Sequence, residues 1–494
     1  MCGIIGYSEG GRSPDVADLL QILAHRGPDG RGVWQDAHHT FGHTRLSIID
    51  LVGGSQPMAG IGDRFHITYN GEVYNYQGLR RRLGEEHFRT QSDTEAILAL
   101  AHTGAPPERW VRQLDGMFAF GLACGKDLLL ARDPLGIKPL YLARHGEALV
   151  FASEIKALPP GRREVSEFPP GHVYTHKGGL RRYYHMHAGK HDVTEAAHAA
   201  GGIRTRLERA VRKRLIADVP VGVFLSGGLD SSLIAALACR YKGDLNTFAI
   251  GTADSEDLPV ARQVAEFLGT RHRERLYTVE EAIRALPEVI HYLESFDAAL
   301  VRSAVPNFFL AKLASEYVKV TLAGEGADEL FAGYEYLKAL DLASLDGELR
   351  QITAALHNTN LQRCDRMSMA HGLEVRVPFL DVAVVDYAMR IVPELKQRGP
   401  ERQEKWILRR MAEDLLPAPV AWRRKEKFAV GSGLGDHLAR LADRTISDPE
   451  FQRHRRVNDD LILRSKEELY YFRIFREMYP QDDLLPLIGR SRSV

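Results

Sequence analysis

Apolar and polar positions in the second half of the chain alternate between helical runs and short apolar strands. The pattern predicts a helix over Ile203–Leu215, a strand up to Leu225, a helix up to about Tyr241, and strands over Asn246–Gly251 and Val318–Ala323. Alternation of helices with buried strands predicts a parallel sheet covered by helices, an α/β arrangement.

The first half of the chain shows short strands that are broken by turns. Residues Arg45–Asp50 alternate apolar and polar side chains and predict a strand, and Phe65–Tyr69 predicts another. The segment His25–Gly30 is a predicted turn, and Ser92–Glu95 opens a predicted helix. At 494 residues the chain is long enough for two or more domains, each with its own core.

A polar stretch rich in Ala, Gly and His separates the two patterns. It follows the run Tyr183–His187 and reaches about Gly202. We therefore predict a first domain over residues 1–187, a linker over 188–202 and a second domain over 203–494.

Charge and cysteine content narrow the classes of protein. The chain has 65 basic and 65 acidic residues, and this balance argues against a nucleic-acid partner. It has no run of about 18 apolar residues and no basic-then-apolar leader, so we expect neither a membrane span nor a signal peptide. The four cysteines lie far apart, which fits a reducing cytoplasm without disulfides or a zinc site.

The stretch Val219–Ser232 is an apolar strand that runs into a Ser-Gly-Gly turn and then a helix. Gly227 and Gly228 can adopt backbone angles closed to other residues, and Ser231 lies where the positive end of the helix begins. The turn is therefore a candidate phosphate cradle, although a plain glycine turn is the simpler alternative. It lacks the Lys-Ser/Thr of a P-loop and the glycine spacing of a dinucleotide fold.

Ligands of parallel α/β sheets bind at the carboxyl ends of the strands. Leu225 and Ile250 lie at two such ends, where adenine could rest, unless they only pack the core. Glu325 and Asp328 follow a third strand, three residues apart in a first helical turn, where carboxylates also favour the helix dipole. Because Mg²⁺ takes one or two carboxylates plus phosphate oxygens, we predict that Asp230 and Asp328 bind it.

The chain opens with Met1-Cys2-Gly3, and removal of Met1 would leave Cys2 with a free α-amine. The amine, with an ordinary pKa of about 7.7 to 8.0, can take the proton of a thiol with a pKa of about 8.5. Cys2 is therefore a candidate nucleophile with its own base, and a buried cysteine in a first strand is the alternative.

Five motifs follow Cys2 in chain order: His25–Gly30, Arg45–Asp50, Asn70–Asn75, Ser92–Glu95 and Arg132–Tyr141. Together they resemble the class II glutamine amidotransferase domain over about residues 2–185. The resemblance implies an α+β N-terminal-nucleophile hydrolase fold of four layers, with two antiparallel sheets between helices.

The same resemblance implies roles for individual side chains. Cys2 would attack the side-chain amide of glutamine, while Asn70 and the Gly71 backbone N–H would stabilise the oxyanion. Arg45 has the planar guanidinium suited to the α-carboxylate of glutamine, and Asp93 offers a charge for its α-ammonium. The implied glutamine site also contains Ile49 and Glu72.

In the second half, the heptapeptide Ser226–Ser232 resembles the pyrophosphate loop of ATP pyrophosphatases. This loop, the run Gly324–Glu329 and the amidotransferase motifs together resemble glutamine-dependent asparagine synthetases over nearly the whole chain. Further matches lie at 361–369, 375–381 and 421–427. The resemblance implies that Lys425 steadies charge on the reacting oxygens and that Glu325 is the base toward ammonia. It also implies an ATP site formed by Leu225, Ser226, Gly227, Gly228, Asp230, Ser231, Ile250, Ala323 and Gly324.

The resemblance implies two half-reactions that use ATP and Mg²⁺. Cys2 would release ammonia from glutamine, and the second domain would join aspartate to AMP as β-aspartyl-AMP before ammonia attacks the activated carbonyl. A homodimer is also implied. The mature protein would work on small molecules in the cytoplasm, without a nucleic-acid or membrane partner.

Two positions depart from one well-known branch of the family. Ala323 stands where that branch has a serine, and residues 298–301 read Ala-Ala-Leu-Val where it has threonines before Arg302. The acceptor is therefore either aspartate or another carboxylate of a specialised biosynthetic pathway. Arg302 is either an anion contact or one side of a structural ion pair.

Other classes of protein fit less well. A phosphoribosyl amidotransferase would lack Ser226–Ser232, and relatives that close β-lactam rings would not need Cys2. A non-catalytic relative would have no need of a nucleophile, a base and metal-binding acids together, which here are Cys2, Asn70, Asp230, Glu325, Asp328 and Lys425.

Overall fold

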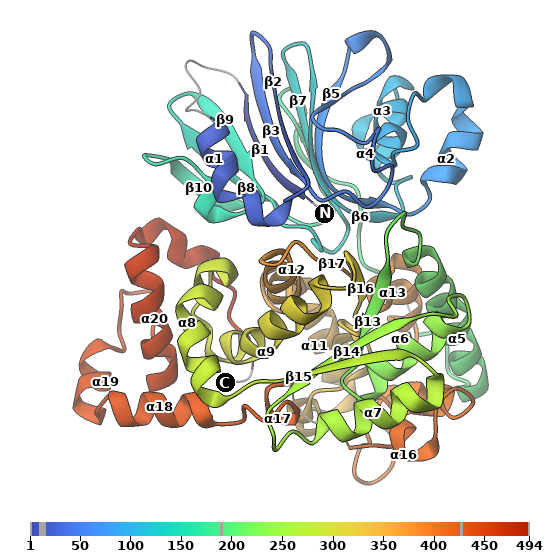
Figure 1. Ribbon diagram of the computed structural model, residues 1–494, viewed down its shortest axis with the longest axis vertical. Helices are drawn as coiled ribbons and strands as arrows, with labels where there is room; N and C mark the ends of the chain where they lie inside the picture. Colours follow the sequence, from blue (N-terminus) through green and yellow to red (C-terminus); the bar gives the residue numbers. More distant parts are fainter. Residues whose placement is uncertain (1, 9–15, 188–190, 425–427, 493–494) are drawn as a thin grey trace. The chain divides into compact units, whose positions relative to one another are not determined.

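The computed structural model describes residues 2–8, 16–187, 191–424 and 428–492 (Figure 1). The chain divides into two compact units. The first comprises residues 1–185 with 216–219 and 369–374, and the second comprises 186–215, 220–368 and 375–494. No helix in the described ranges is long and apolar enough to cross a membrane.

The first unit contains two six-stranded antiparallel sheets. One has the order β10-β8-β9-β1-β3-β2 and the other β12-β11-β7-β6-β5-β4. The strands are β1 (Cys2–Ser8), β2 (Gly30–Gln35), β3 (His39–Arg45), β4 (Met58–Ala59), β5 (His66–Val73), β6 (Gly116–Cys124), β7 (Asp127–Arg132), β8 (Tyr141–His145), β9 (Ala148–Ala152), β10 (Arg163–Glu167), β11 (His172–Thr175) and β12 (Gly179–Arg182).

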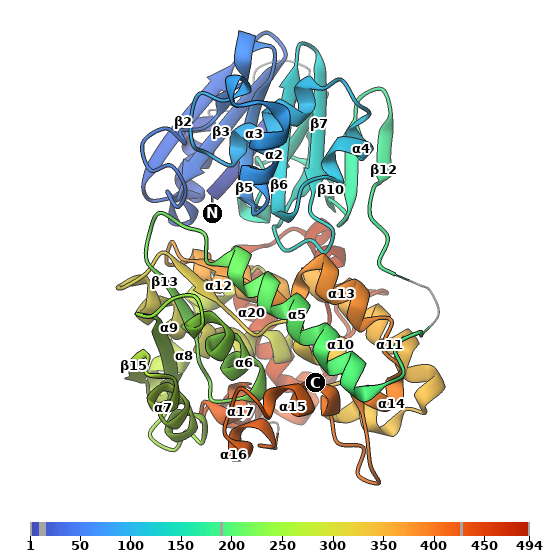
Figure 2. The ribbon, with the colours of Figure 1, turned by 90° about the vertical axis from the view of Figure 1, so that its right-hand side faces the viewer.

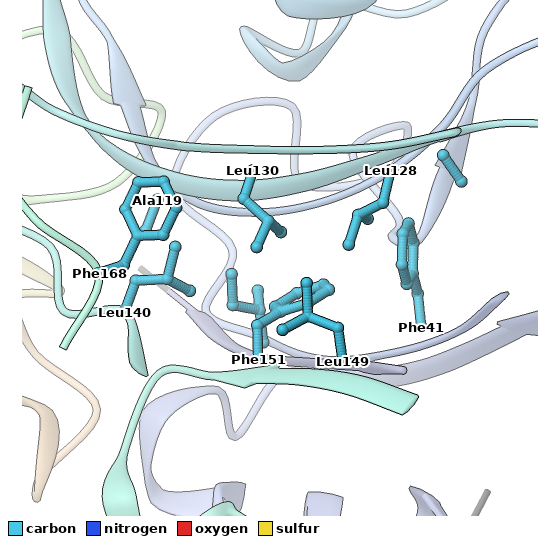
Figure 3. Close-up of a cluster of buried hydrophobic side chains, with 10 residues drawn as sticks. Phe41, Ala119, Leu128, Leu130, Leu140, Leu149, Phe151 and Phe168 are labelled. Carbon is cyan, nitrogen blue, oxygen red and sulfur yellow. The ribbon is translucent and has the colours of Figure 1, made fainter. Parts of the chain in front are cut away.

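The two sheets face each other across an apolar core. Figure 3 shows Leu128 and Leu130 of one sheet pointing toward Leu149 and Phe151 of the other. Helix α1 packs on β1 and β3, and α3 packs on β5, so each sheet carries a helix. The helices of this unit are α1 (Val16–Ile22), α2 (Tyr76–Leu83), α3 (Thr94–His102) and α4 (Pro107–Val111). The four-layer α+β fold is confirmed.

Two local predictions in this unit are wrong. The strand expected over Arg45–Asp50 ends at Arg45. The backbone after it folds back so that the Asp50 carbonyl accepts a hydrogen bond from the Arg45 guanidinium, and Asp50 adopts a φ of 50°. Asn70 and Gly71 do not follow a strand but lie inside β5, where they pair with β6. The site residues of this segment are therefore held by a sheet rather than by a loop.

The second unit contains one five-stranded sheet with the order β15-β14-β13-β16-β17. Strand β13 pairs in parallel with β14 and β16, and β14 pairs in parallel with β15, which confirms the predicted parallel sheet. The strands are β13 (Val221–Phe224), β14 (Asn246–Gly251), β15 (Arg271–Leu276), β16 (Val320–Leu322) and β17 (Glu374–Arg376).

Helices cover this sheet and extend beyond it. The helix predicted from Ile203 begins earlier, at Ala196, within the predicted linker, and α5 lies along one side of the unit (Figure 2). The helices are α5 (Ala196–Arg214), α6 (Leu229–Cys239), α7 (Asp257–Leu268), α8 (Val279–Leu293), α9 (Ala298–Ser315), α10 (Ala327–Phe331), α11 (Leu342–Ala354), α12 (Asn360–Met369), α13 (Val382–Ala388), α14 (Pro393–Lys396), α15 (Trp406–Ala412), α16 (Ala418–Ala421), α17 (Phe428–Gly431), α18 (His437–Thr445), α19 (Asp448–His454) and α20 (Lys466–Met478).

The strand order places a switch point between β13 and β16. The chain moves outward from β13 through β14 to β15, then returns past β13 to β16. Helix α6 packs on β13 and α7 on β14 and β15, while α9 packs on β14 and β15 and α8 packs on α9. Right-handed crossovers place α6 and α7 on one face of the sheet and α9 on the other. The carboxyl ends of β13 and β16 therefore open between the two layers, where ligands of such sheets bind.

Candidate functional site

The candidate nucleophile Cys2 begins β1, and its side chain is buried. Its backbone N donates a hydrogen bond to Asn70 Oδ1 at 3.0 Å. Its carbonyl accepts one from Arg26 Nε at 3.1 Å, and the same guanidinium pairs with Glu154 at 2.7 Å. Burial raises the pKa of the Cys2 thiol, so the thiolate needs a nearby base. The sequence predicted no role for Arg26, although this residue lies in the predicted turn His25–Gly30.

Asn70 and Gly71 lie beside the nucleophile on β5. Asn70 is fully buried, and its Nδ2 has no hydrogen-bond partner among the described residues. An orphaned buried donor is costly unless a ligand satisfies it, which fits an oxyanion contact. At Gly71 a Cβ would lie 2.1 Å from the Met117 carbonyl oxygen, so the close approach of β6 requires glycine there.

Arg45 lies opposite Cys2 in the pairing of β1 with β3. Its guanidinium donates to three backbone carbonyls of one loop, those of Asp50 at 2.5 Å, Leu51 at 3.1 Å and Ile49 at 3.4 Å. The same group that is predicted to bind a carboxylate thus shapes the adjacent loop. Its contact with glutamine stays a prediction.

Asp93 lies against β5, the strand that carries Asn70 and Gly71. Its Oδ2 accepts hydrogen bonds from the Tyr69 hydroxyl and the Val73 backbone N, both at 2.9 Å. Burial raises the pKa of the Asp93 carboxyl, and an ammonium ligand beside it would favour its charged form. Glu72 and Ile49 are also buried, and their contacts with glutamine stay predictions.

In the second unit the predicted phosphate cradle keeps its shape by internal hydrogen bonds. The Ser226 backbone N donates to Ser231 Oγ at 3.1 Å, and that hydroxyl donates to the Gly228 carbonyl at 3.2 Å. Gly227 has φ of +73°, and a Cβ there would lie 2.6 Å from the Ala261 backbone N. Both constraints favour glycine.

Gly324 brings the second strand end against this loop. A Cβ at Gly324 would lie 2.9 Å from Asp230 Cβ and 3.0 Å from the Ser231 backbone N. The start of α6 and the end of β16 therefore meet at this point, as the switch point requires.

These segments enclose a cavity of about 370 Å³. Every residue of the predicted ATP site lines it except Gly227. Glu325 and Asp328 also line it, together with Arg302. Two further lining residues, Lys405 and Arg363, had no role predicted from the sequence. The cavity has the size and the mixed apolar and charged lining of a nucleotide and small-molecule site.

Lys405 is the main residue that sequence reasoning missed. Its buried Nζ lies 2.5 Å from Asp230 Oδ2 and 2.6 Å from Asp328 Oδ1. Burial opposes its charge, but the two carboxylates outweigh burial and raise the pKa of Lys405. It precedes α15 at φ of 53°, and no local motif marked it.

The two predicted Mg²⁺ ligands fit a cation. Asp230 Oδ1 is buried and has no hydrogen-bond partner among the described residues. A buried carboxylate oxygen of this kind, beside a second carboxylate and a phosphate cradle, is a suitable hard ligand.

Glu325, the predicted base, forms an ion pair. Arg363 Nη2 lies 2.5 Å from Glu325 Oε1, and Arg363 Nη1 donates to Asn307 Oδ1 at 3.2 Å. Arg302 is in an ion pair as well, with its Nε 3.2 Å from Glu467 Oε1. The predicted Lys425 lies outside the described residues.

A further polar cluster lines the cavity next to Asp328. Glu329 accepts a hydrogen bond from the Tyr334 hydroxyl at 2.5 Å and from Asn360 Nδ2 at 3.0 Å. Burial, followed by the charge of Asp328, raises the pKa of Glu329 to about 7. These three residues come from separate segments, and no periodicity or spacing in the sequence indicates that they associate.

Comparisons with known proteins bear on both units. A family model described as glutamine amidotransferase domain matches residues 1–168, and one described as asparagine synthase matches 202–351 and 343–485. One solved structure, the glutamine phosphoribosylpyrophosphate amidotransferase of B. subtilis, aligns at 19% identity with a TM-score of 0.33 over 55% of this chain and 65% of that chain.

Curated relatives align along nearly the whole chain. Asparagine synthetase [glutamine-hydrolyzing] 3 of Arabidopsis thaliana is 39% identical over 97% of this chain and 88% of its own length. Asparagine synthetase B of Escherichia coli (strain K12) is 39% identical over 94% and 88%, and the probable Dictyostelium discoideum synthetase is 36% identical over 99% and 96%. By these matches, the chain belongs to the family of glutamine-hydrolysing asparagine synthetases.

Proposed function

We propose that this protein makes L-asparagine from L-aspartate, L-glutamine and ATP, releasing L-glutamate, AMP and diphosphate. One observation carries the proposal: a single chain contains two separate sets of groups. In one, Cys2 lies beside the Asn70 amide, whose Nδ2 has no partner among the described residues. In the other, the glycine loop and carboxylates line a cavity of the size that ATP needs. Its relatives named as glutamine-hydrolysing asparagine synthetases are 39% identical over nearly the full chain.

In the first half-reaction the Cys2 sulfur bonds to the amide carbon of glutamine. The α-amine of Cys2 takes the thiol proton and passes it to the departing ammonia. Asn70 Nδ2 and the Gly71 N–H stabilise the oxyanion while the C–N bond breaks. Water then cleaves the thioester and releases glutamate.

In the second half-reaction a carboxylate oxygen of aspartate bonds to the α-phosphorus of ATP, and diphosphate leaves. The Ser226–Ser231 loop holds the phosphates by its N–H and hydroxyl groups. Asp230 and Asp328 would hold Mg²⁺, whose charge offsets that of the phosphates when it is bound. Ammonia then attacks the acyl carbon of β-aspartyl-AMP and AMP leaves, while Glu325 takes a proton from the nitrogen.

Replacement of Cys2 with Ala tests this division of labour. We expect Cys2→Ala to lose glutamine-dependent asparagine formation by at least about 10³-fold and to keep ammonia-dependent formation within a few fold. Product is measured as asparagine and AMP with glutamine or ammonium chloride as the nitrogen source. Failure of ammonium chloride to support the variant would contradict the two-site scheme.

The acceptor is tested by diphosphate release across a panel of carboxylic acids. Aspartate is expected to give the highest kcat/KM. A different best acid would instead support the same chemistry in a specialised pathway.

The finer assignments are part of the same proposal. We propose Mg²⁺ as the cation, a homodimer, a cytoplasmic location, and functional domains over 1–187 and 203–494. The family resemblance supports them, and light scattering together with metal titration checks the first two.

A further inference from the structure

Residues Gly489–Arg492 lie beyond the part of the chain that the asparagine synthase family model matches, which ends at residue 485. Arg490, Ser491 and Arg492 nevertheless line the cavity. They contact the segment before α9, helix α11 and the short 3₁₀ helix at Ala355–Asn358. This wall is formed by elements other than the β13–α6 loop that cradles phosphate.

The segment, which we call the 489–492 segment, is held by directional contacts. The Ser491 backbone N and hydroxyl donate to Asp297 Oδ2 at 3.0 Å and Oδ1 at 2.7 Å. Arg490 Nη2 lies 2.6 Å from Glu468 Oε1. A Cβ at Gly489 would lie 1.9 Å from the Asn358 carbonyl oxygen, so only glycine lets the backbone pass this close. Asp297 also caps α9, so the segment and the helix share one anchor.

Four arginines that line the cavity are each paired with a carboxylate, and of these carboxylates Glu325 lines the cavity as well. Each arginine here faces a carboxylate: Arg302 with Glu467, Arg363 with Glu325, Arg490 with Glu468, and Arg492 with Glu348. An amino-acid acceptor presents an ammonium and two carboxylates. The arginines offer partners for its carboxylates, and the cavity-lining Glu325 offers one for its ammonium.

Arg492 differs from the other three in its accessibility. Its Nη2 donates to Gln351 Oε1 at 2.7 Å and its Nε lies 3.4 Å from Glu348 Oε1, yet its side chain remains 54% exposed. The side chains of Arg302, Arg363 and Arg490 are 18%, 7% and 19% exposed and are engaged in closer pairs. Arg492 therefore keeps donors for an incoming carboxylate, and guanidinium binds carboxylate in a planar, two-pronged geometry.

We propose that the 489–492 segment completes the acceptor site, with Ser491 anchoring the segment to Asp297 and the Arg492 guanidinium binding the α-carboxylate of the acceptor amino acid. The inference rests on the proposed function. It assigns recognition of the acceptor to a segment outside the matched synthetase region.

The test is aspartate-dependent exchange of labelled diphosphate into ATP, which reports adenylation alone. We expect Arg492→Ala to raise the KM for aspartate about tenfold or more, with the KM for ATP and the glutaminase rate unchanged. Arg492→Lys should restore part of the affinity, because it returns the charge without the planar fork. The matched control is Arg456→Ala, another exposed arginine in an ion pair, with Asp459 at 2.9 Å, and it should leave all three quantities unchanged.

The outcomes separate this inference from the proposed function. An unchanged KM for aspartate in Arg492→Ala, or an equal rise in the KM for ATP, would overturn the inference alone. Absence of aspartate-dependent exchange in the unmodified protein would overturn the proposed function and the inference with it. Ser491→Ala gives a second check, because loss of the anchor should also raise the KM for aspartate while circular dichroism stays unchanged.

Discussion

Asn70 serves two purposes with one amide group. Its Oδ1 accepts the backbone N–H of Cys2, which orients the nucleophile, and its Nδ2 is left as a buried donor without a partner among the described residues. A buried unpaired donor costs about 1–3 kcal/mol of folding free energy. The proposed oxyanion contact would account for this loss of stability, because the donor is already in place before the substrate binds.

Asn70→Ala should lower the glutaminase kcat about 10²- to 10³-fold, because the oxyanion loses a preorganised donor. Ammonia-dependent asparagine formation should stay within a few fold of the unmodified rate. Both rates are measured on the same preparation. The control is Asn75→Ala, a half-buried asparagine of the same motif whose side chain hydrogen-bonds only to the backbone of Gln113 and Asp115 in the contacts described. Equal loss of both activities would mean that Asn70 acts on folding rather than on the oxyanion.

Lys396 shows the opposite case of a buried charge without a functional site. It is fully buried in α14, its Nζ has no hydrogen-bond partner among the described residues, and burial lowers the pKa of Lys396 to about 8. The unfolded chain binds this proton below pH of about 10.5 and the folded chain only below about 8. The free energy of unfolding therefore falls as pH drops from 10.5 to 8 and stays low below that range.

Replacing Lys396 with Met should raise the free energy of unfolding at pH 7 by up to about 3 kcal/mol, the value of a pKa lowered from 10.5 to about 8. The gain should shrink toward pH 10. Denaturant unfolding at pH 7 and pH 9.5 measures it, with exposed Lys312→Met as control, for which we expect less than about 0.5 kcal/mol. A destabilised Met variant at pH 7 would contradict this assignment.

At the scale of elements, the nucleotide site depends on how closely β16 approaches the start of α6. Gly324 permits this approach because its missing Cβ would lie 2.9 Å from Asp230 Cβ and 3.0 Å from a backbone N. Neither neighbour is the end of a flexible side chain, so neither can move without shifting the helix.

Gly324→Ala should therefore destabilise the second unit by about 1–3 kcal/mol and lower aspartate-dependent ATP–diphosphate exchange by at least about tenfold. The control is Gly347→Ala in α11, where a Cβ meets nothing within 4 Å, and which should be neutral or stabilising by about 0.5–1 kcal/mol. Thermal unfolding and the exchange rate are the two measurements. Normal exchange in Gly324→Ala would show that the end of β16 and the start of α6 need not lie this close together.

At the scale of the whole molecule, the described residues that we propose for each half-reaction lie within one unit. The proposed nucleophile Cys2 and the proposed oxyanion donors lie in the first unit, and the cavity proposed for the nucleotide is lined by the second unit alone. The two activities should therefore respond separately to changes in either unit.

Asp328→Asn is the counterpart of Cys2→Ala in this respect. Loss of one predicted metal ligand and of a Lys405 partner should lower AMP formation by at least about 10²-fold. Glutamine hydrolysis, measured as glutamate release, should persist. A glutaminase that fails together with AMP formation would contradict the separation of the two activities.

Continuous motifs were predicted well, because strand, turn and helix follow one another in the sequence and fix a site by local geometry. The strand over Asn246–Gly251 and the turn after β13 are of this kind. The strand expected over Arg45–Asp50 failed because a side chain, Arg45, draws the backbone out of the sheet. The alternation of apolar and polar residues carries no information about such a side-chain contact.

The sequence by itself determined the two fold classes, and it predicted a nucleophile at Cys2 and a phosphate cradle, since the residues of each motif are neighbours in the chain. Only the tertiary structure decided the partners of the acids. Lys405 reaches Asp230 across 175 residues of chain, and Arg492 reaches Gln351 across 141. Pairs so distant in sequence are set by how helices pack around the sheet, and a buried charge such as that of Lys405 is stable only beside such partners.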